Sequence, residues 1–299
     1  MPFLATFAGG AVRPYRANRV GTGSITVNYS IVSGGGSGMS ANMRYVSPGG
    51  GGGIFQTTSI PISRMAYIVI GAGGAVTIPT EFTQMIYGNN GSPSTIYNGS
   101  GLFVQPLGGG GGGSNGASGG GAAIDYSPFP NTFQSWGVGL GTAGQGNNGG
   151  NVTLGGTSAY GGAGGGGGAG GVGALSNWST GGAGGAGLAC SSTDGVVRAG
   201  GGGGFTGNLT AAAAGTGGGG VSAVLVGANG AANTGGGGGG AWYVVTNYEN
   251  VLGGNGGSGI VVIQYAGTVA LARGGTITGV GTGPIRHTFT SSGIFTVIA

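Results

Sequence analysis

Titratable and nucleophilic side chains, the groups that could carry out covalent chemistry, are scarce in this sequence and form no catalytic motif. One histidine, His287, and one cysteine, Cys190, accompany four acids. A glycosidase would need a pair of carboxylates, and a Ser-His-Asp triad would have to use His287, but the spacing supports neither arrangement. We therefore expect no catalytic residues, with His287 at a surface or strand end and Cys190 as a small packed residue. The acids are Glu81, Asp125, Asp194 and Glu249.

Aromatic side chains are better candidates for function, because they gather in three short inserts between glycine-rich stretches. Exposed rings on the loops of a rigid scaffold suit the binding of sugars or proteins. The same rings could instead bury the ends of a glycine-rich bundle that has no side chains of its own. Both interpretations stay open, and they can coexist within one loop. The candidates are Tyr126, Phe129, Phe133 and Trp136 in the first insert, Trp178 in the second, and Trp242, Tyr243 and Tyr248 in the third.

The basic residues, all eight of them arginines, point to a partner only at the N-terminal end. Arg13, Tyr15, Arg16 and Arg19 form either a solvated arm or a docking peptide for a partner. The net charge is +4 and no basic stripe runs along the chain, so we expect no nucleic-acid binding. One cysteine and one histidine cannot form a Cys/His metal site, and a P-loop lysine is lacking, so no metal and no cofactor is expected.

Composition narrows the kind of structure that can position these residues. Of 299 residues, 86 are glycine and only 4% are charged. The glycines occur in blocks and there are 10 prolines, which excludes a collagen repeat. A hydrophobic share of 38% with few charges favours ordered structure over disorder. No apolar run approaches the roughly 18 residues of a membrane helix, so no membrane insertion is expected.

Four regions follow from the patterning: an N-terminal arm (1–24), a β-rich region (25–107), a glycine-rich region (108–257) and a C-terminal strand with a hairpin (258–299). Residues 25–32 alternate apolar and polar side chains, as a half-buried strand does. Glycine is a poor helix former, so essentially no α-helix is expected. Further strands are predicted within 65–74, 95–99, 101–107 and 258–267, and a hairpin with a Ser-Ser-Gly turn over 287–299.

The glycine blocks must gain something specific from being ordered, because folded glycine loses more backbone freedom than any other residue. Extended threefold helices of the polyglycine II kind could lie close together and form lateral N–H···O bonds. The alternative is that the blocks are flexible linkers, which usually carry serine and charge. We predict an all-β or irregular fold, with short sandwich-like strands flanking a bundle of polyglycine-II-like segments.

Several motifs resemble the glycine-rich domain of bacteriophage virion proteins. They are GGSGIVVIQY (256–265), ANTGGGGGGA (232–241) and GGAGGAGLA (181–189), together with YIVIGAGG and FTSSGIFTV. In that family the FTSSGxFTV-type hairpin opens the domain, whereas here it ends the chain, and ITVNYSIVSGGG could fill its place. The start FAGGAVRPY also looks like the short N-terminal anchors of phage fibre and baseplate proteins.

The resemblance implies a non-enzymatic component of the virion surface, on the tail or the outside of the capsid. The first hypothesis is a tail fibre or adhesin whose aromatic loops contact a host glycan or outer-membrane protein. The alternative is a capsid or tail decoration or cement protein, and a weaker third is a glycan-cleaving spike. Docking to other virion proteins would use Arg13, Tyr15, Arg16 and Arg19. A homotrimer is a family expectation only, because no coiled-coil heptads are visible.

Overall fold

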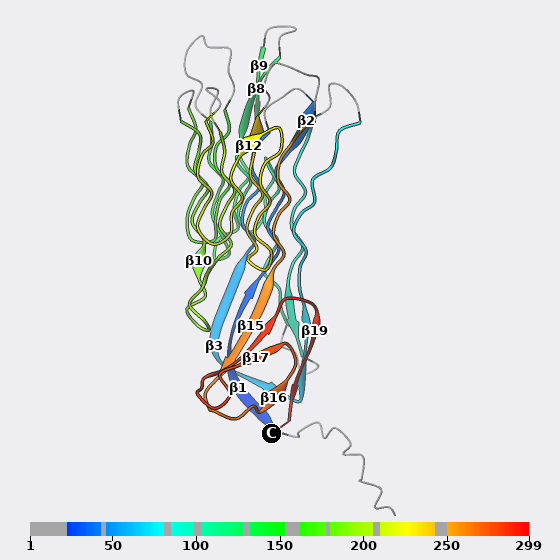
Figure 1. Cartoon of the computed structure of the whole chain (residues 1–299), viewed down its shortest axis with the longest axis vertical. Helices are drawn as coiled ribbons and strands as arrows, with labels where there is room; N and C mark the ends of the chain where they lie inside the picture. Colours follow the sequence, from blue (N-terminus) through cyan, green and yellow to red (C-terminus); the bar gives the residue numbers. More distant parts are fainter. Residues whose placement is uncertain are drawn as a thin grey trace, which may run out of the picture.

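The protein is elongated, with a β-sandwich at one end and a bundle of glycine-rich segments extending from it (Figure 1). A computed structural model describes residues 23–42, 46–80, 85–98, 103–127, 132–152, 162–177, 180–205, 210–242 and 250–298. Within these ranges the regular structure is β-strand without α-helix, as the sequence predicts. We call the sandwich end the base and the opposite end of the bundle the distal end.

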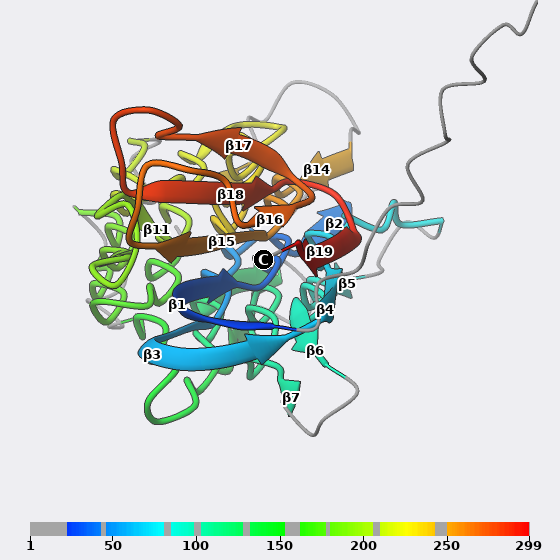
Figure 2. The ribbon, with the colours of Figure 1, turned by 90° about the horizontal axis from the view of Figure 1, so that it is seen from below.

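Two five-stranded antiparallel sheets form the sandwich, which Figure 2 shows from the base. The first sheet has the order β17 (Thr276–Thr278), β18 (Ile285–Phe289), β15 (Ile260–Tyr265), β1 (Ser24–Val32) and β3 (Ile54–Ser63). The second has the order β16 (Ala272–Arg273), β19 (Gly293–Val297), β4 (Met65–Val69), β6 (Thr95–Tyr97) and β7 (Phe103–Val104). The main hydrophobic core lies between the sheets, because side chains of both belong to one buried cluster.

Strand β1 shows how the sequence pattern produces this core. Ile25, Val27, Tyr29 and Ile31 are buried, as their alternation predicts. The strands predicted within 65–74, 95–99, 101–107 and 258–267 correspond to β4, β6, β7 and β15. Strand β3 has no counterpart among the predicted runs, because half of the residues in its sequence IFQTTSIPIS are polar and it includes Pro61. It lies at the edge of the first sheet, where a proline is tolerated.

The predicted hairpin over 287–299 is wrong. Strand β18 pairs with β15 and β17 in the first sheet, whereas β19 pairs with β4 and β16 in the second. The Ser-Ser-Gly segment therefore joins the two sheets instead of closing a hairpin. Both strands have buried residues at alternating positions, and both contribute to the core between the sheets. Alternation identifies a buried face, but it does not identify the sheet to which a strand belongs.

Residues 33–39, which continue directly from β1, form a central segment of the bundle with hydrogen bonds that repeat every three residues. Their N–H groups donate over 2.9–3.0 Å to three different segments in turn. Three residues per turn is the period of polyglycine II. The donors at positions 33, 36 and 39 bond to segment 46–53, those at 34 and 37 to segment 87–94, and those at 35 and 38 to segment 253–259.

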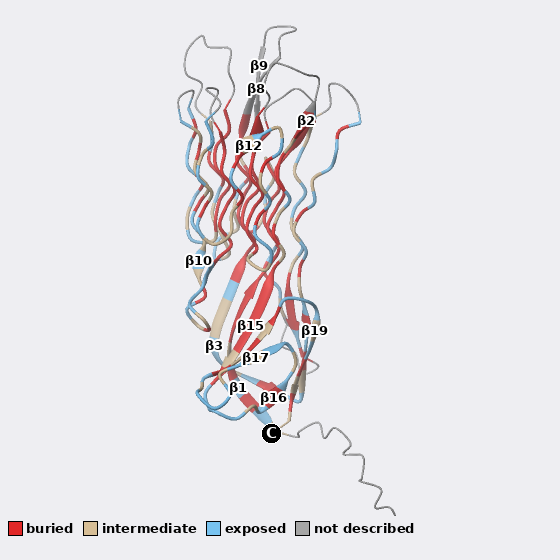
Figure 3. Ribbon diagram, viewed as in Figure 1, coloured by how far each residue is buried: buried red, intermediate tan, exposed pale blue. Residues whose placement is uncertain are grey.

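The carbonyl groups of the same segment accept from three further segments, so it has six hydrogen-bonded neighbours. Each neighbour is also bonded to the next one around the ring, which closes a hexagon about residues 33–39. Figure 3 shows the buried centre of this bundle. The backbone polar groups at the centre are thus paired with each other, as the sequence argument requires. In order around the ring, the neighbours are 46–53, 105–112, 87–94, 71–79, 253–259 and 235–240.

Close lateral packing explains why these segments must be glycine. A Cβ atom on Gly36 would lie 2.1 Å from the carbonyl oxygen of Gly110, and one on Gly202 would lie 2.0 Å from that of Gly238. Cβ atoms in proteins do not approach backbone atoms so closely. The end of a side chain can move away by a change of rotamer, but a neighbouring backbone atom cannot. Segments of the predicted β-rich region 25–107 take part in the bundle as well as in the sandwich.

Small β-structures complete the molecule. A three-stranded sheet at the distal end joins β14 (Asn250–Leu252), β2 (Ser40–Asn42) and β5 (Met85–Ile86). Nearby are the parallel pair β12 (Ala223–Val224) with β13 (Ala241–Trp242) and the hairpin β8 (Ala123–Ser127) with β9 (Thr132–Trp136). The pair β10 (Leu188–Ala189) with β11 (Val197–Arg198) lies alongside the junction of bundle and sandwich.

Candidate functional site

The distal end is the candidate site, because the strands that carry the described aromatic candidates, β8, β9 and β13, lie there (Figure 1). Bridges between Val46 and Ala241 and between Ala163 and Phe205 join chain segments there. Several of the described ranges of the chain begin or end at this end of the molecule (Figure 1). The flanking described residues are Asn42 and Val46, Thr80 and Met85, Ser127 and Thr132, Val152 and Gly162, Asn177 and Thr180, Phe205 and Thr210, and Trp242 and Asn250.

Trp242 is the candidate aromatic whose surroundings are described, and its ring is buried. It is 4% exposed and packs against Phe205, with ring centroids 6.0 Å apart, beside Ala123 and Ala163. Among the described residues, none is a hydrogen-bond partner for its indole N–H. The ring therefore caps the end of the bundle, and it could contact a receptor only after this packing changes.

The hairpin β8–β9 positions three further candidates by its register. Tyr126 stands opposite Phe133, and Ala123 stands opposite Trp136. The other aromatic candidates, Phe129, Trp178, Tyr243 and Tyr248, lie outside the described residues, as do Arg13, Tyr15, Arg16 and Arg19. Receptor binding by the aromatic residues and docking by the N-terminal residues both stay predictions.

Sequence reasoning missed a second apolar cluster at the distal end. Met39, Ala41, Val46, Ala241 and Val251 are fully buried together, and two of them belong to the small sheet β14–β2–β5. Each of these residues lies within three residues of a glycine in the sequence, and this proximity is a weak signal. The cluster fixes the distal strands to the bundle, which gives the adjoining chain segments rigid attachment points.

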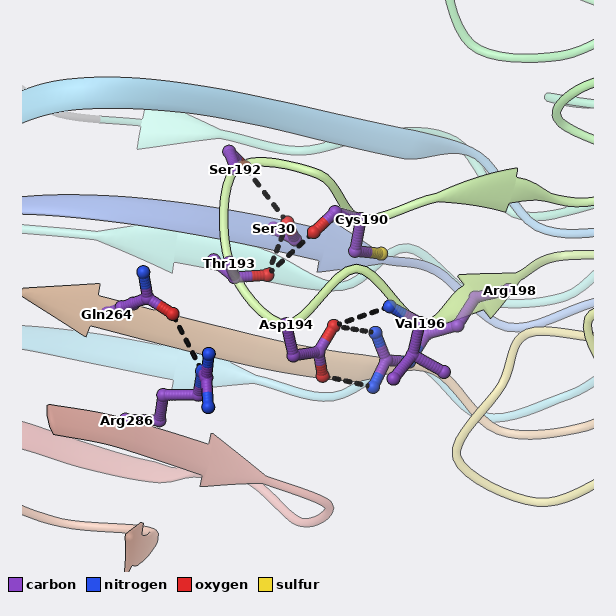
Figure 4. A network of polar contacts seen from close by, with 9 residues as sticks. All are labelled: Ser30, Cys190, Ser192, Thr193, Asp194, Val196, Arg198, Gln264 and Arg286. Carbon is purple, nitrogen blue, oxygen red and sulfur yellow. Dashed lines mark hydrogen bonds and ion pairs between the residues drawn. The ribbon is translucent and has the colours of Figure 1, made fainter. Parts of the chain in front are cut away.

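A network of polar side chains lies near β10 and β11 (Figure 4). Arg198 donates to both carboxylate oxygens of Asp194, over 2.8 and 2.7 Å, and Ser30 bonds to Thr193 over 2.9 Å. Desolvation raises the pKa of Asp194, but the hydrogen bonds from Arg198 and from the backbone, together with the positive charge of Arg198, outweigh it, so the pKa lies below its ordinary value.

Cys190 in this cluster is not an activated nucleophile. Burial raises the pKa of its thiol above the ordinary value, although Arg198 acts in the opposite direction. The side chain packs with Val32, Ile54 and Val262, as expected for a small packed residue. The hydrogen bonds of this cluster hold the loop between β10 and β11 against β1.

The expectation that His287 lies at a surface or strand end is wrong. The side chain is fully buried between the two sheets. Its Nδ1 lies 2.7 Å from the carbonyl oxygen of Gly274, its Nε2 lies 3.1 Å from the hydroxyl of Tyr265, and its ring meets that of Phe295 edge-on. The sequence signal was the alternation of Ile285, His287 and Phe289, which places the histidine on the apolar face of β18.

The described residues contain neither a metal-binding cluster nor a helix that could cross a membrane. They contain no group of three or more His, Cys, Asp or Glu side chains placed to hold an ion. No helix among these residues is long and apolar enough to span a bilayer.

Comparison with protein families shows to which family this glycine-rich chain belongs. A family model described as "Glycine-rich domain" matches residues 16–266. The chain belongs to this glycine-rich domain family. Comparison with curated proteins and with solved structures gave no match.

The matched range of the glycine-rich domain contains the bundle and the distal strands, and it ends just after β15. Strands β16 to β19 lie beyond it, although they complete both sheets of the sandwich. The glycine-rich domain of this protein is therefore packed as one body with strands that the family model does not include.

Proposed function

We propose that this protein is a surface component of a bacteriophage virion, a tail fibre or adhesin that recognises the host through its distal end. The observation that carries the proposal is the hydrogen-bonded glycine bundle, which holds chain segments rigidly at one end, away from the sandwich. Binding residues on loops that a rigid scaffold positions are a common arrangement for recognition. Phage origin rests on the motifs GGSGIVVIQY and FTSSGIFTV and on the resemblance that they carry.

The opposite end of the molecule suits attachment. Gly23, the first described residue after the N-terminal arginines, accepts a hydrogen bond from the N–H of Arg64 at the base. An N-terminal arm that starts there would leave the distal end free. We propose that Arg13, Tyr15, Arg16 and Arg19 dock on another virion protein.

A binding assay with a matched control tests host recognition. Purified, fluorescently labelled protein is incubated with a panel of intact bacterial strains, and bound protein is measured by flow cytometry. The double variant Tyr126→Ser, Phe133→Ser changes a cross-strand aromatic pair at the distal end. The control, Tyr67→Ser with Tyr97→Ser, changes an exposed cross-strand aromatic pair at the base.

We expect the wild type to bind a subset of strains, the distal variant to lose at least about tenfold in affinity, and the control to bind normally. One buried aromatic contact at an interface contributes about 1–2 kcal/mol or more, which corresponds to this loss. Thermal unfolding of both variants establishes that they fold. Equal loss in both variants, or no binding to any strain, would contradict the proposal.

A decoration or cement protein is the second candidate, and the burial of Trp242 is the observation that favours it. The buried ring of Trp242 caps the bundle, and this structural role explains the aromatic residue without a receptor. Quantitative mass spectrometry of the particle separates the two functions. A few copies per particle support a fibre, and hundreds of copies support a decoration protein.

A further inference from the structure

Exposed asparagine side chains along the bundle repeat one arrangement five times, and each of these asparagines is followed by a glycine. The side-chain Oδ1 accepts a hydrogen bond from a backbone N–H of a neighbouring segment, over 2.7–2.8 Å. The N–H of the glycine donates to a backbone carbonyl oxygen of the same segment, over 2.8–3.1 Å. We call this arrangement the Asn-Gly clamp. The five asparagines are Asn90, Asn115, Asn148, Asn229 and Asn255.

The clamp at Asn255 shows the geometry. Its Oδ1 accepts from the N–H of Val76 over 2.7 Å. The N–H of Gly256 donates to the carbonyl oxygen of Gly74 over 2.8 Å. One asparagine and the glycine after it therefore bind segment 71–79 at two points, through the side chain and through the backbone.

Close packing requires glycine after each of these asparagines. A Cβ atom on Gly256 would lie 2.0 Å from the carbonyl oxygen of Gly35, and one on Gly91 would lie 2.1 Å from that of Gly34. At the glycines of the other three clamps a Cβ atom would also meet a backbone atom at 2.1 Å. Two structural demands, an acceptor on one side chain and no Cβ atom on the next residue, thus place the dipeptide Asn-Gly at five positions of the bundle.

Asn-Gly is also the dipeptide in which asparagine, a chemically labile residue, deamidates most readily. The glycine nitrogen attacks Cγ of the asparagine side chain and a C–N bond forms. The side-chain amide leaves as ammonia, which takes up the proton that the glycine nitrogen loses. Water then opens the cyclic imide to aspartate or isoaspartate. Glycine favours the first step, because no side chain hinders its nitrogen and its backbone turns freely.

We infer that the Asn-Gly clamps are deamidation sites that the closed bundle protects and that local opening exposes. In a clamp both the side-chain oxygen and the glycine N–H are hydrogen-bonded, so the nitrogen cannot turn towards Cγ until these bonds break. Exposure alone would predict fast deamidation, because all five asparagines lie on the surface. Isoaspartate lengthens the main chain, so the glycine N–H no longer lies opposite its acceptor and the bundle cannot reclose as before. The inference does not depend on the proposed host recognition.

Peptide mass spectrometry of the aged protein tests the inference. The folded full-length protein, the same protein in urea and synthetic peptides spanning each Asn-Gly are incubated at mildly alkaline pH. We expect the protein in urea to deamidate as fast as the peptides, and the folded protein to deamidate at least about tenfold more slowly at all five sites. A smaller difference at any of the five sites would overturn the inference.

A matched pair of variants at Val76 separates the clamp from folding in general. Val76→Pro removes the N–H that bonds to Asn255 and suits an extended threefold segment, whereas Val76→Ala keeps this N–H. Val76→Pro should raise the deamidation rate at Asn255 about fivefold, the factor that corresponds to one lost hydrogen bond of about 1 kcal/mol. The rate at Asn148, whose clamp binds another segment, should stay unchanged in both variants. Equal rates at Asn255 in the two variants, or an equal rise at Asn148, would overturn the role of the clamp.

Discussion

His287 is held in its neutral form by the atoms around it. A carbonyl oxygen can only accept a hydrogen bond, so the contact with Gly274 requires the proton on Nδ1. Nε2 then accepts from the hydroxyl of Tyr265, which in turn accepts from the N–H of Leu271. Burial lowers the pKa of His287 below its ordinary value of 6.5, and the bond to Gly274 offsets part of this shift.

Acid should therefore destabilise the sandwich before the carboxylates titrate. The unfolded chain binds a proton at His287 below pH 6.5, whereas the folded chain binds it only at lower pH, so the free energy of unfolding falls as the pH decreases. The slope can reach about 1.4 kcal/mol per pH unit for one group. Urea unfolding between pH 7.5 and 5.0 measures it.

The variant His287→Gln is the control for this prediction, because glutamine does not titrate. It should be less stable than the wild type at pH 7.5, but its stability should change little down to pH 5.0. If both proteins lose stability equally over this range, another group is responsible.

At the scale of elements, the threefold period explains where the bundle accepts side chains. In a helix with three residues per turn, residues i and i+3 share one side. Val172 and Leu175 are 65% and 64% exposed, and Val221 and Val224 are 49% and 48% exposed, so these pairs follow the outer side of peripheral segments. Residues that face a neighbouring segment at close approach have no room for a Cβ atom, as Gly36 and Gly202 show.

Alanine substitution at a central and at an open glycine should therefore differ sharply. Gly36→Ala places a methyl group 2.1 Å from the carbonyl oxygen of Gly110, which forces segments 33–39 and 105–112 apart. We expect a loss of about 3 kcal/mol in the free energy of unfolding. At Gly137 no described heavy atom beyond the two flanking residues lies within 4 Å of the added methyl group, so Gly137→Ala should be neutral or stabilising by up to about 1 kcal/mol.

Chemical unfolding of both variants gives these values, and hydrogen exchange locates the effect. The amide protons of residues 200–204, 235 and 237–240 should exchange orders of magnitude more slowly than those of an unfolded peptide, because they are hydrogen-bonded to neighbouring segments. Fast exchange there, or similar stability of the two alanine variants, would show that the bundle does not form as described.

At the scale of the whole molecule, bundle and sandwich are joined in two ways. Strand β1 leads directly into segment 33–39, and segments 46–53 and 253–259 lead into β3 and β15. In addition, the loop between β10 and β11 packs on the first sheet. Gln56 donates to the carbonyl oxygen of Ala189 over 3.1 Å, and Ser192 donates to that of Tyr29 over 3.0 Å.

We expect these connections to make the protein unfold in a single cooperative transition. Differential scanning calorimetry should show one peak, and hydrogen exchange should rise together in segment 33–39 and in β15 as denaturant is added. Arg198→Ala, which leaves the partly buried Asp194 without its ion-pair partner, should lower the free energy of unfolding by about 2 kcal/mol. Two separate peaks in the wild type would show that bundle and sandwich are independent units.

The sequence by itself determined the kinds of element in this protein. Blocks such as 49–53 and 235–240 exclude helix, because glycine is a poor helix former, and they permit close lateral packing, because they have no side chains. Alternation in 25–32 determined a strand with one buried face. These are local properties, since each depends only on residues close together in the chain.

Only the tertiary structure decided which elements are neighbours. One glycine block has no side chain to distinguish it from another, so nothing local specifies that segment 33–39 lies beside both 105–112 and 253–259. In the same way, β18 and β19 are adjacent in sequence but belong to different sheets, and this separation buries His287 in the core. Such pairings depend on how the whole chain satisfies its backbone hydrogen bonds at once, and that condition is global.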